Sequence, residues 1–287
     1  MTTRDPQRQT TESQAEGEAE GEAIPRAAPD PLDPGLEPDR WALFLDVDGT
    51  LLGFQGRPED VHLHDSLRRI LHALDARLCH ALALVSGRTL ADLDRIQAPL
   101  KLPAAGLHGL ECRDADGTVD RGVEGAALDH MRAGLSAFVD RHDALWLEDK
   151  GRTLAVHYRA DPRLQRTVLD RVHALCAGEA PDTLTVLDGK MVCEVKPRHA
   201  DKGSAIRSFM TRPPFAGRLP VFLGDDVTDE DGFRAVNALG GLSIRVGAEP
   251  AGELTHAAYR LADEPAVEAW LERVRQAVVP GRPARGG

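Results

Sequence analysis

Two carboxylates that can bind a metal ion stand directly after an apolar run. The run Trp41–Leu45 consists of large apolar residues, which is typical of a strand buried on both faces of a parallel sheet. Asp46 and Asp48 follow it, so the strand would present both carboxylates at its carboxyl end, where open α/β sheets bind ligands. An unpaired buried carboxylate is costly, so this pair requires a cation, hydrogen-bond donors or water. Mg²⁺ suits such a site because it takes one or two carboxylates and completes its shell with water and phosphate oxygens.

Three more groups of polar residues stand at the ends of predicted elements. They are Ser86-Gly87-Arg88 after the apolar run 81–85, Lys202 just inside a predicted helix, and Asp225, Asp226 and Asp229 after the run 219–223. Taken singly, each has an ordinary explanation as a helix cap or a turn. Together with Asp46 and Asp48, they supply what phosphoryl transfer needs: a nucleophile, a metal site, a hydroxyl near N–H donors and a fixed cation.

Alternation of apolar runs with amphipathic segments defines the expected fold. Strands are predicted at 41–45, 81–85, 102–107, 219–223 and 242–246, and helices at 63–78, 90–96, 201–210, 229–238 and 265–278. This pattern predicts a Rossmann-like α/β core with a parallel sheet. The middle third differs, with helices at 126–141 and 162–176 and antiparallel strands at 145–148, 153–158, 183–187 and 191–195. We therefore expect a core formed by residues 39–114 and 198–280, interrupted by an α/β cap at 115–197.

Composition and charge exclude several classes of protein. The chain has 287 residues, 42% of them hydrophobic, which is enough for a substantial core. No apolar run approaches the roughly 20 residues of a membrane span, and the N-terminal residues have no hydrophobic signal core. The net charge of −11, without a basic stripe, argues against a nucleic-acid partner. We therefore expect a cytoplasmic monomer that acts on a small molecule.

The cysteines and the N-terminal segment offer no chemistry of their own. The four cysteines, Cys79, Cys112, Cys176 and Cys193, form no CxxC pair and are interpreted as small buried side chains. Residues 1–38 are acidic and then proline-rich, and they contain no aromatic residue. Such a segment cannot bury enough apolar surface to offset its chain entropy, so a disordered tail is expected.

The combined motifs resemble a known group of phosphatases. Asp46-Val-Asp48-Gly-Thr, Ser86, Lys202 and Gly224-Asp225-Asp-Val-Thr-Asp229 resemble the four motifs of the haloacid-dehalogenase superfamily. Other stretches are similar to its trehalose-6-phosphate phosphatase family, above all Gly189-Lys190-Met-Val-Cys-Glu194 and the Gly-Asp-Asp-Val-Thr-Asp-Glu sequence at 224–230. The resemblance spans about residues 41–278 and implies hydrolysis of trehalose 6-phosphate through an aspartyl-phosphate, with Mg²⁺ as cofactor.

The resemblance also implies individual roles for the core residues. Asp46 would be the nucleophile and Asp48 the acid and base, while Ser86 and Lys202 would hold phosphoryl oxygens. Mg²⁺ would bind the carboxylates of Asp46 and Asp225 and the backbone carbonyl of Asp48. The supporting residues Asp226 and Asp229 would orient Lys202 and metal-bound waters. Repulsion between two like charges 4 Å apart, about 4 kcal/mol at an effective dielectric of 20, supports the need for the metal.

Sugar recognition is expected in the cap. The resemblance makes Lys190 and Glu194 the sugar ligands, with Lys150 next. Other candidates for the cleft are Arg88, His108, His157, Arg159 and Lys196. His157 and Arg159 alternate along a predicted strand, which is equally consistent with a solvated strand face. Glu111 either lines the cleft floor or serves as a structural partner of Arg88.

Other functions are compatible with part of this pattern. A phosphatase of another sugar phosphate, such as sucrose 6-phosphate, or a phosphosugar mutase would share the core and differ in its cap ligands. A non-catalytic sugar-phosphate sensor would have no need of Asp46 and Asp48, yet both are present. A module that only binds other proteins would not need four motifs at strand ends.

Overall fold

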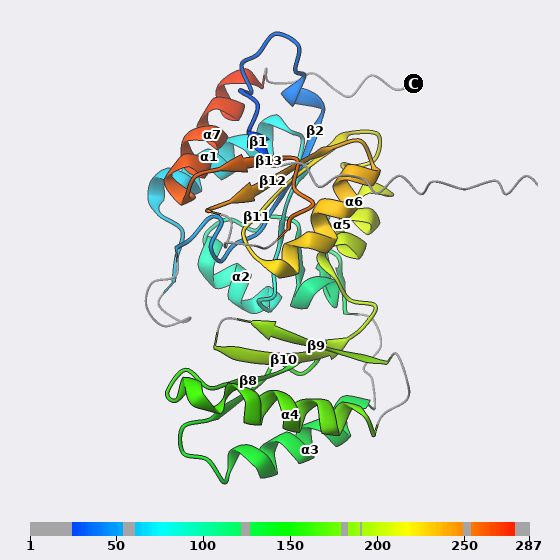
Figure 1. Cartoon of the computed structure of the whole chain (residues 1–287). Coiled ribbons are helices and arrows are strands. Elements are labelled where there is room, and N and C mark those ends of the chain that lie inside the picture. The colour runs from blue at the N-terminus through cyan, green and yellow to red at the C-terminus, as the bar shows by residue number, and fades with distance from the viewer. Residues whose placement is uncertain are drawn as a thin grey trace, which may run out of the picture.

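The structure is a computed structural model that describes residues 25–53, 61–121, 127–178, 183–189, 191–248 and 254–278. These residues form two sheets, each with its own helices (Figure 1). The larger sheet has nine strands in the described ranges. In spatial order they are β1 (Arg26–Ala27), β13 (Tyr259–Leu261), β12 (Leu242–Val246), β11 (Leu219–Gly224), β2 (Trp41–Leu45), β3 (Leu82–Val85), β4 (Ala104–Gly106), β5 (Glu111–Arg113) and β6 (Val119–Asp120).

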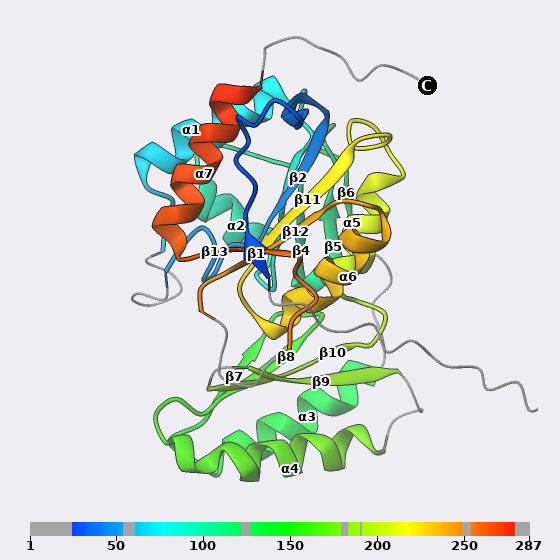
Figure 2. The ribbon, with the colours of Figure 1, turned by 45° about the horizontal axis from the view of Figure 1, so that its top comes forward.

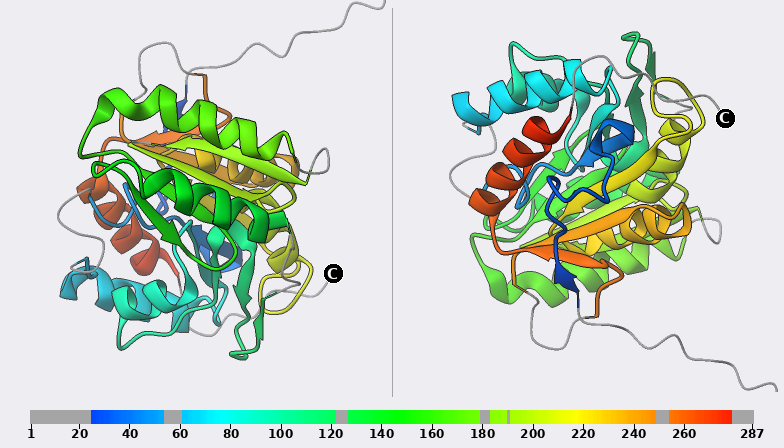
Figure 3. Two further views of the ribbon diagram at one scale, coloured as in Figure 1. Left: turned by 90° about the horizontal axis from the view of Figure 1, so that it is seen from below. Right: turned by 90° about the horizontal axis from the view of Figure 1, so that it is seen from above.

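The larger sheet is parallel from β1 to β4, and only the pairings of β4 with β5 and of β5 with β6 are antiparallel. Helices α1 (Asp65–Arg77) and α7 (Glu264–Ala277) lie on one face, and α5 (Lys202–Met210) and α6 (Glu230–Ala238) lie on the other (Figure 3). All five residues of β2 are buried, as expected for a strand that is covered on both faces. The predicted α/β class and its parallel core sheet are therefore confirmed.

Strand β2 lies at the point where the strand order reverses. Its neighbours are β11 on one side and β3 on the other, and the chain reaches them in opposite directions along the sheet. Ligands of open α/β sheets bind at such a switch point, outside the carboxyl ends of the strands. The short helix α2 (Leu90–Gln97) begins after β3, with Thr89 as its N-cap residue. The sequence between β3 and α2, which contains Ser86, Gly87 and Arg88, is therefore placed beside the end of β2.

The smaller sheet and two helices form the second unit. Its strands, in spatial order, are β7 (Trp146–Asp149), β8 (Leu154–His157), β10 (Val192–Pro197) and β9 (Leu184–Gly189), all antiparallel. Helices α3 (Ala127–Val139) and α4 (Gln165–Cys176) cover the sheet face that points away from the core (Figures 1 and 2). A separate hydrophobic cluster, which includes Met131, Val156 and Val172, fills the space between this sheet and its helices. We call this unit the cap and the larger one the core.

Part of the N-terminal segment differs from the expectation. Residues 1–24 lie outside the described residues, but residues 25–38 pack on the core instead of forming a disordered tail. Strand β1 pairs in parallel with β13, the Trp270 indole donates to the Pro29 carbonyl (2.9 Å), and Arg273 pairs with Asp30. A two-residue edge strand has no alternating pattern by which sequence can reveal it. None of the helices in the described ranges is long and apolar enough to cross a membrane.

Candidate active site

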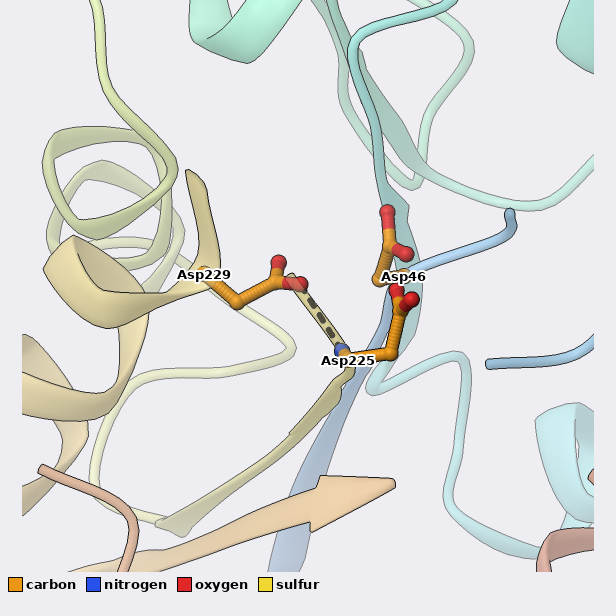
Figure 4. Close-up of side chains that lie close together, drawn as sticks. All are labelled: Asp46, Asp225 and Asp229. Carbon is orange, nitrogen blue, oxygen red and sulfur yellow. Dashed lines mark hydrogen bonds between the residues drawn. The ribbon is translucent and has the colours of Figure 1, made fainter. Parts of the chain in front are cut away.

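Three carboxylates from separate motifs meet at the switch point. Asp46 follows β2, Asp225 follows β11, and Asp229 ends the short helix η5 (Val227–Asp229). One oxygen from each carboxylate lies within 4.8 Å of the others (Figure 4). Asp46 and Asp229 are only 3% and 0% exposed. Burial raises the pKa of Asp46 well above its usual range, although the nearby Lys202 ammonium opposes the shift.

Lys202 forms a buried bridge between two of these carboxylates. Its Nζ donates to Asp46 Oδ1 (2.8 Å) and to Asp229 Oδ1 (2.5 Å). Burial alone would lower the pKa of Lys202, but the two carboxylates outweigh burial and raise it. Lys202 is the first residue of α5, which Asp201 caps by accepting from Ser204 N (2.6 Å). The cap residue thus fixes the start of the helix that places the ammonium group.

The cluster fits a divalent cation. Three carboxylates and one ammonium group give a formal charge of −2. Asp225 Oδ1 is buried and has no hydrogen-bond partner among the described residues. Burial, together with the charge of Asp229, raises the pKa of Asp225 to about 7. Oxygen donors of this kind suit a hard ion such as Mg²⁺, which would relieve both the repulsion and the unpaired oxygen.

The remaining acidic residues of this motif have structural partners. Asp229 Oδ2 accepts from the backbone N–H groups of Asp225 and Asp226 (2.9 Å each), so both of its oxygens are occupied. Asp226 Oδ1 accepts from Val227 N (2.6 Å) and caps the short helix η5, and no contact with Lys202 is described for it. The expectation that Asp229 orients Lys202 agrees with this geometry. Asp226 is described as a helix cap that also lines the cavity, so its role in orienting metal-bound waters stays a prediction.

Gly49 allows Asp225 to approach the end of β2. The φ angle of Gly49 is +82°, and a Cβ atom at this position would lie 2.0 Å from Asp225 Oδ2. A side chain would therefore clash with the carboxylate and strain the backbone as well. This is a physical reason for glycine directly after the second aspartate of the motif.

Asp48 and Arg88 form an ion pair beside the cluster. Arg88 Nε and Nη2 donate to the two oxygens of Asp48, each at 2.6 Å. Burial would lower the pKa of Arg88, but the Asp48 carboxylate raises it. Ser86 is 2% exposed, and its Oγ accepts from Arg88 N (3.3 Å). The structure therefore brings together the strand-end residues of β2 and β3, as the sequence predicts.

Glu194 of the cap joins a hydrogen-bond network that reaches the core. Its Oε1 accepts from Thr153 Oγ1 (2.6 Å) and Lys150 Nζ (3.4 Å), and its Oε2 lies 3.3 Å from His108 Nε2. Lys150 Nζ also donates to the Gly87 carbonyl of the core (3.4 Å). Burial would raise the pKa of Glu194, but His108 and Lys150 lower it to about 2. Thr153 is fully buried, and sequence reasoning did not identify it as part of the site.

His108 is held tightly at the end of β4. Its backbone is left-handed (φ 57°), like that of Leu107 (φ 49°), which is unusual for residues other than glycine. Burial lowers the pKa of its imidazole, although Glu194 opposes this shift. A Cβ atom on Gly87 would lie 2.8 Å from His108 Nε2, so only glycine leaves room for the ring. The expectation that His108 stands on the cleft floor agrees with this position.

A cavity of about 740 Å³ lies between the core and the cap. Its volume is within the usual range for small-molecule sites. The core contributes Asp48, Gly87, Arg88, Asp92, Arg95, His108, Asp226 and Thr228, and the cap contributes Trp146, Glu148, Lys150, His157, Arg159, Leu187, Gly189, Val192 and Glu194. The lining therefore joins Asp48 and Arg88, at the edge of the candidate phosphoryl-transfer site, to the candidate sugar ligands Lys150 and Glu194. The more deeply buried Asp46, Ser86 and Lys202 are not part of the lining.

The other candidate residues that the structure describes divide into those that line the cavity and those that lie away from it. His157 and Arg159, for which a solvated face was equally plausible, both line the cavity. Glu111 accepts from Leu90 N (3.0 Å) at the start of α2, so its role is structural, although its partner is not Arg88. Lys196 is buried and donates to the Ala200 carbonyl, which is a structural contact rather than a ligand position. Lys190 lies outside the described residues.

Comparison with known proteins identifies the family. The trehalose-phosphatase family profile matches residues 44–265, which is most of the chain. The protein belongs to the trehalose-phosphatase family. The sequence is 45% identical over 209 residues to a probable trehalose-phosphate phosphatase of Sinorhizobium fredii, covering 73% of this chain and 78% of the relative. It is 38% identical over 240 residues to trehalose-6-phosphate phosphatase of Escherichia coli, covering 83% and 88%.

The fold of this family member also matches a solved structure. The C-terminal domain of Candida albicans trehalose-6-phosphate phosphatase has a TM-score of 0.71 with this chain, at 23% identity, covering 84% of this chain and 94% of that one. Because the identity is low, this likeness concerns the fold. The family assignment confirms the resemblance drawn from the motifs and shows that the protein is a phosphatase.

Proposed function

We propose that the protein is a Mg²⁺-dependent phosphatase that hydrolyses trehalose 6-phosphate to trehalose and phosphate. The observation that carries this proposal is the cavity that joins Asp48 and Arg88 of the core to Lys150 and Glu194 of the cap. Phosphate chemistry at one end and paired donors and acceptors for hydroxyl groups at the other end match a sugar phosphate. The named relatives support the choice of trehalose 6-phosphate.

Asp46 is the proposed nucleophile. Its carboxylate is fixed by Lys202 at the end of a fully buried strand, so attack needs little reorganisation. A carboxylate oxygen bonds to phosphorus, the bond from phosphorus to the sugar oxygen breaks, and an aspartyl-phosphate forms. Water then attacks phosphorus, and the bond to Asp46 breaks to release phosphate.

Asp48 is the proposed acid and base. In the first step its carboxyl proton passes to the leaving sugar oxygen, and in the second step its carboxylate takes a proton from the attacking water. Arg88 holds the Asp48 carboxyl group in one orientation through two hydrogen bonds. Both Asp48 oxygens accept from Arg88 in the structure, so Asp48 would take up its proton only when Arg88 turns one N–H group to a phosphoryl oxygen. Arg88 lines the cavity and stays a proposed substrate ligand.

The other charged groups of the core neutralise the substrate. The carboxylates of Asp46 and Asp225 and the backbone carbonyl of Asp48 would hold Mg²⁺. When bound, the ion would supply positive charge that allows an anionic nucleophile to approach an anionic ester. Lys202 and the hydroxyl of Ser86 would hold the phosphoryl oxygens, and Asp229 keeps Lys202 in place.

The cap would recognise the sugar through Lys150 and Glu194, with Lys190 as a further ligand. The contacts of Glu194 with His108 and of Lys150 with the Gly87 carbonyl support this proposal, because they bring both side chains next to the core. Sugar hydroxyls would replace some of these contacts. The division into a core (39–114 and 198–280) and a cap (115–197), a cytoplasmic location and a monomeric state remain predictions.

The test is phosphate release from trehalose 6-phosphate, with and without Mg²⁺. Glucose 6-phosphate and sucrose 6-phosphate serve as competing substrates. We expect trehalose 6-phosphate to have the highest kcat/KM and turnover to stop when the metal is chelated. A higher kcat/KM for sucrose 6-phosphate would reject the proposed substrate, and turnover without metal would reject the proposed cofactor.

A further inference from the structure

Trp146 is an exposed aromatic residue inside the cavity. Its side chain is 56% exposed, whereas the other two tryptophans of the chain, Trp41 and Trp270, are 1% and 5% exposed and stack on each other in the core (5.7 Å between centroids). The Trp146 ring stacks on the imidazole of His157, with 4.5 Å between centroids and an interplanar angle of 22°. Both residues line the cavity of about 740 Å³. A large apolar ring that is exposed in a polar cavity is suited to binding a ligand with an apolar face.

The orientation of Trp146 is supported by its neighbours. His157 Nε2 lies 2.9 Å from Glu148 Oε2, and this hydrogen bond lowers the pKa of Glu148. This hydrogen bond fixes the imidazole, and the imidazole supports one face of the indole. The stacked pair is therefore a built surface of the cap sheet rather than a side chain that moves freely.

Strand pairing arranges the cavity face of the cap in two rows. Trp146 pairs with His157, which pairs with Val192, which in turn pairs with Gly189, and all four line the cavity. The next row on the same face contains Glu148, Ala155, Glu194 and Leu187. The first row offers an aromatic and apolar surface, and the second row offers the carboxylates. Successive rows on one face are two residues apart, which is about 7 Å along a strand.

The row that contains Glu148 and Glu194 lies nearer to the core than the row that contains Trp146, and this sets the expected direction of a bound ligand. Glu194 lies against His108, and Lys150, which directly follows the end of β7, contacts the Gly87 carbonyl. The carboxylate row is thus the one near the phosphoryl-transfer residues, and the aromatic row lies farther along the cap sheet. The spacing of about 7 Å places the aromatic row beyond the first sugar ring of a bound sugar phosphate.

We propose that Trp146, supported by His157, is a stacking platform for the second sugar ring, the one without phosphate, of a disaccharide phosphate. This proposal rests on the proposed function and deepens it, because it names the residue that distinguishes a disaccharide from a monosaccharide. The C–H face of a pyranose is apolar, and its hydroxyl edge is polar. A rigid indole binds the apolar face at low entropic cost, while the edge stays in contact with polar groups of the cavity.

Substitutions at Trp146 test the platform through substrate discrimination. We expect Trp146→Ala to lower the ratio of kcat/KM for trehalose 6-phosphate to kcat/KM for glucose 6-phosphate by at least about fivefold, mainly through KM. Trp146→Phe should retain most of this ratio, whereas Trp146→Leu, which is apolar but not planar, should resemble the alanine variant. Leu254→Ala is the matched control, because Leu254 is an exposed hydrophobic residue (66%) outside the cavity lining. An unchanged ratio in Trp146→Ala, or equal ratios in the Phe and Leu variants, would overturn the platform.

A binding measurement separates this proposal from the proposed function. In Asp46→Asn, which should bind without turnover, trehalose should shield Trp146 from quenching by acrylamide, whereas glucose should not. Trp146→Phe in the same background should remove the protected signal, which assigns it to this residue. If wild-type protein hydrolyses trehalose 6-phosphate but trehalose never shields Trp146, the platform is wrong and the function stands. If shielding occurs without hydrolysis of that substrate, the platform stands and the proposed function is wrong.

Discussion

Substitution of Glu194 by alanine should reduce activity toward the sugar phosphate much more than activity toward a small ester. The Glu194 side chain is only 12% exposed, and its partners are Thr153 (2.6 Å), Lys150 (3.4 Å) and His108 (3.3 Å). A ligand hydroxyl that uses this acceptor would lose a buried hydrogen bond. Such a loss costs about 1–3 kcal/mol, which corresponds to about a 5- to 150-fold change in affinity.

The assay compares two substrates in the same variant. We expect the ratio of kcat/KM for trehalose 6-phosphate to kcat/KM for p-nitrophenyl phosphate to fall at least about tenfold in Glu194→Ala. The matched control is Glu272→Ala, because Glu272 is also a paired carboxylate but lies on α7 with Arg275. A melting curve shows whether each variant is folded. If both substrates lose activity equally in Glu194→Ala, the residue supports the fold or the core chemistry, and its assignment to the sugar is wrong.

Three other perturbations test the energetics. The pKa of Glu194 is lowered to about 2, so ionised Glu194 stabilises the fold above pH 4.5, its pKa in the unfolded chain, and this stabilisation is lost as the pH falls toward 2. In urea unfolding, the difference in unfolding free energy between wild type and Glu194→Gln should therefore shrink between pH 4.5 and 2. A constant difference would contradict this prediction. Lys202→Met should destabilise the protein by about 3–5 kcal/mol, because two buried carboxylates lose their cation. An unchanged free energy of unfolding in urea would refute this. Deletion of residues 1–38 should lower Tm more than deletion of residues 1–24, because β1 and its contacts are lost only in the longer deletion. Equal Tm values would show that these contacts contribute little to stability.

The candidate catalytic residues of the core can be predicted from the sequence because of the way in which buried parallel strands end. A strand buried on both faces is a continuous apolar run, and the first polar residues after it must lie at the carboxyl edge of the sheet. This argument predicts that Asp46, Ser86 and Asp225 converge, and the structure brings all three to the ends of β2, β3 and β11. Lys202 needs one more step, the capped start of a helix.

Other features depend on contacts that leave no local pattern. Glu111 looks like a site residue in the sequence, but its carboxylate accepts from Leu90 N at the start of α2. Asp226 lines the cavity and also caps a short helix, and the sequence does not reveal this second contact. Strands β1, β5, β6 and β13 contain only two or three residues each, which is too short for periodicity to be read. Trp146 becomes a cavity residue only through its register opposite His157, and register between distant strands is a property of the tertiary structure.

The most direct test of the central claim is phosphate release from trehalose 6-phosphate by wild-type protein and by Asp46→Asn, both with Mg²⁺. The amide keeps the shape of the side chain but loses its nucleophilicity and its charge for the metal. We expect wild type to release phosphate and the variant, with an unchanged melting curve or a small shift, to lose more than about 100-fold in kcat, since a covalent nucleophile contributes far more than that. Residual activity above about one-hundredth of wild type would show that Asp46 is not the nucleophile.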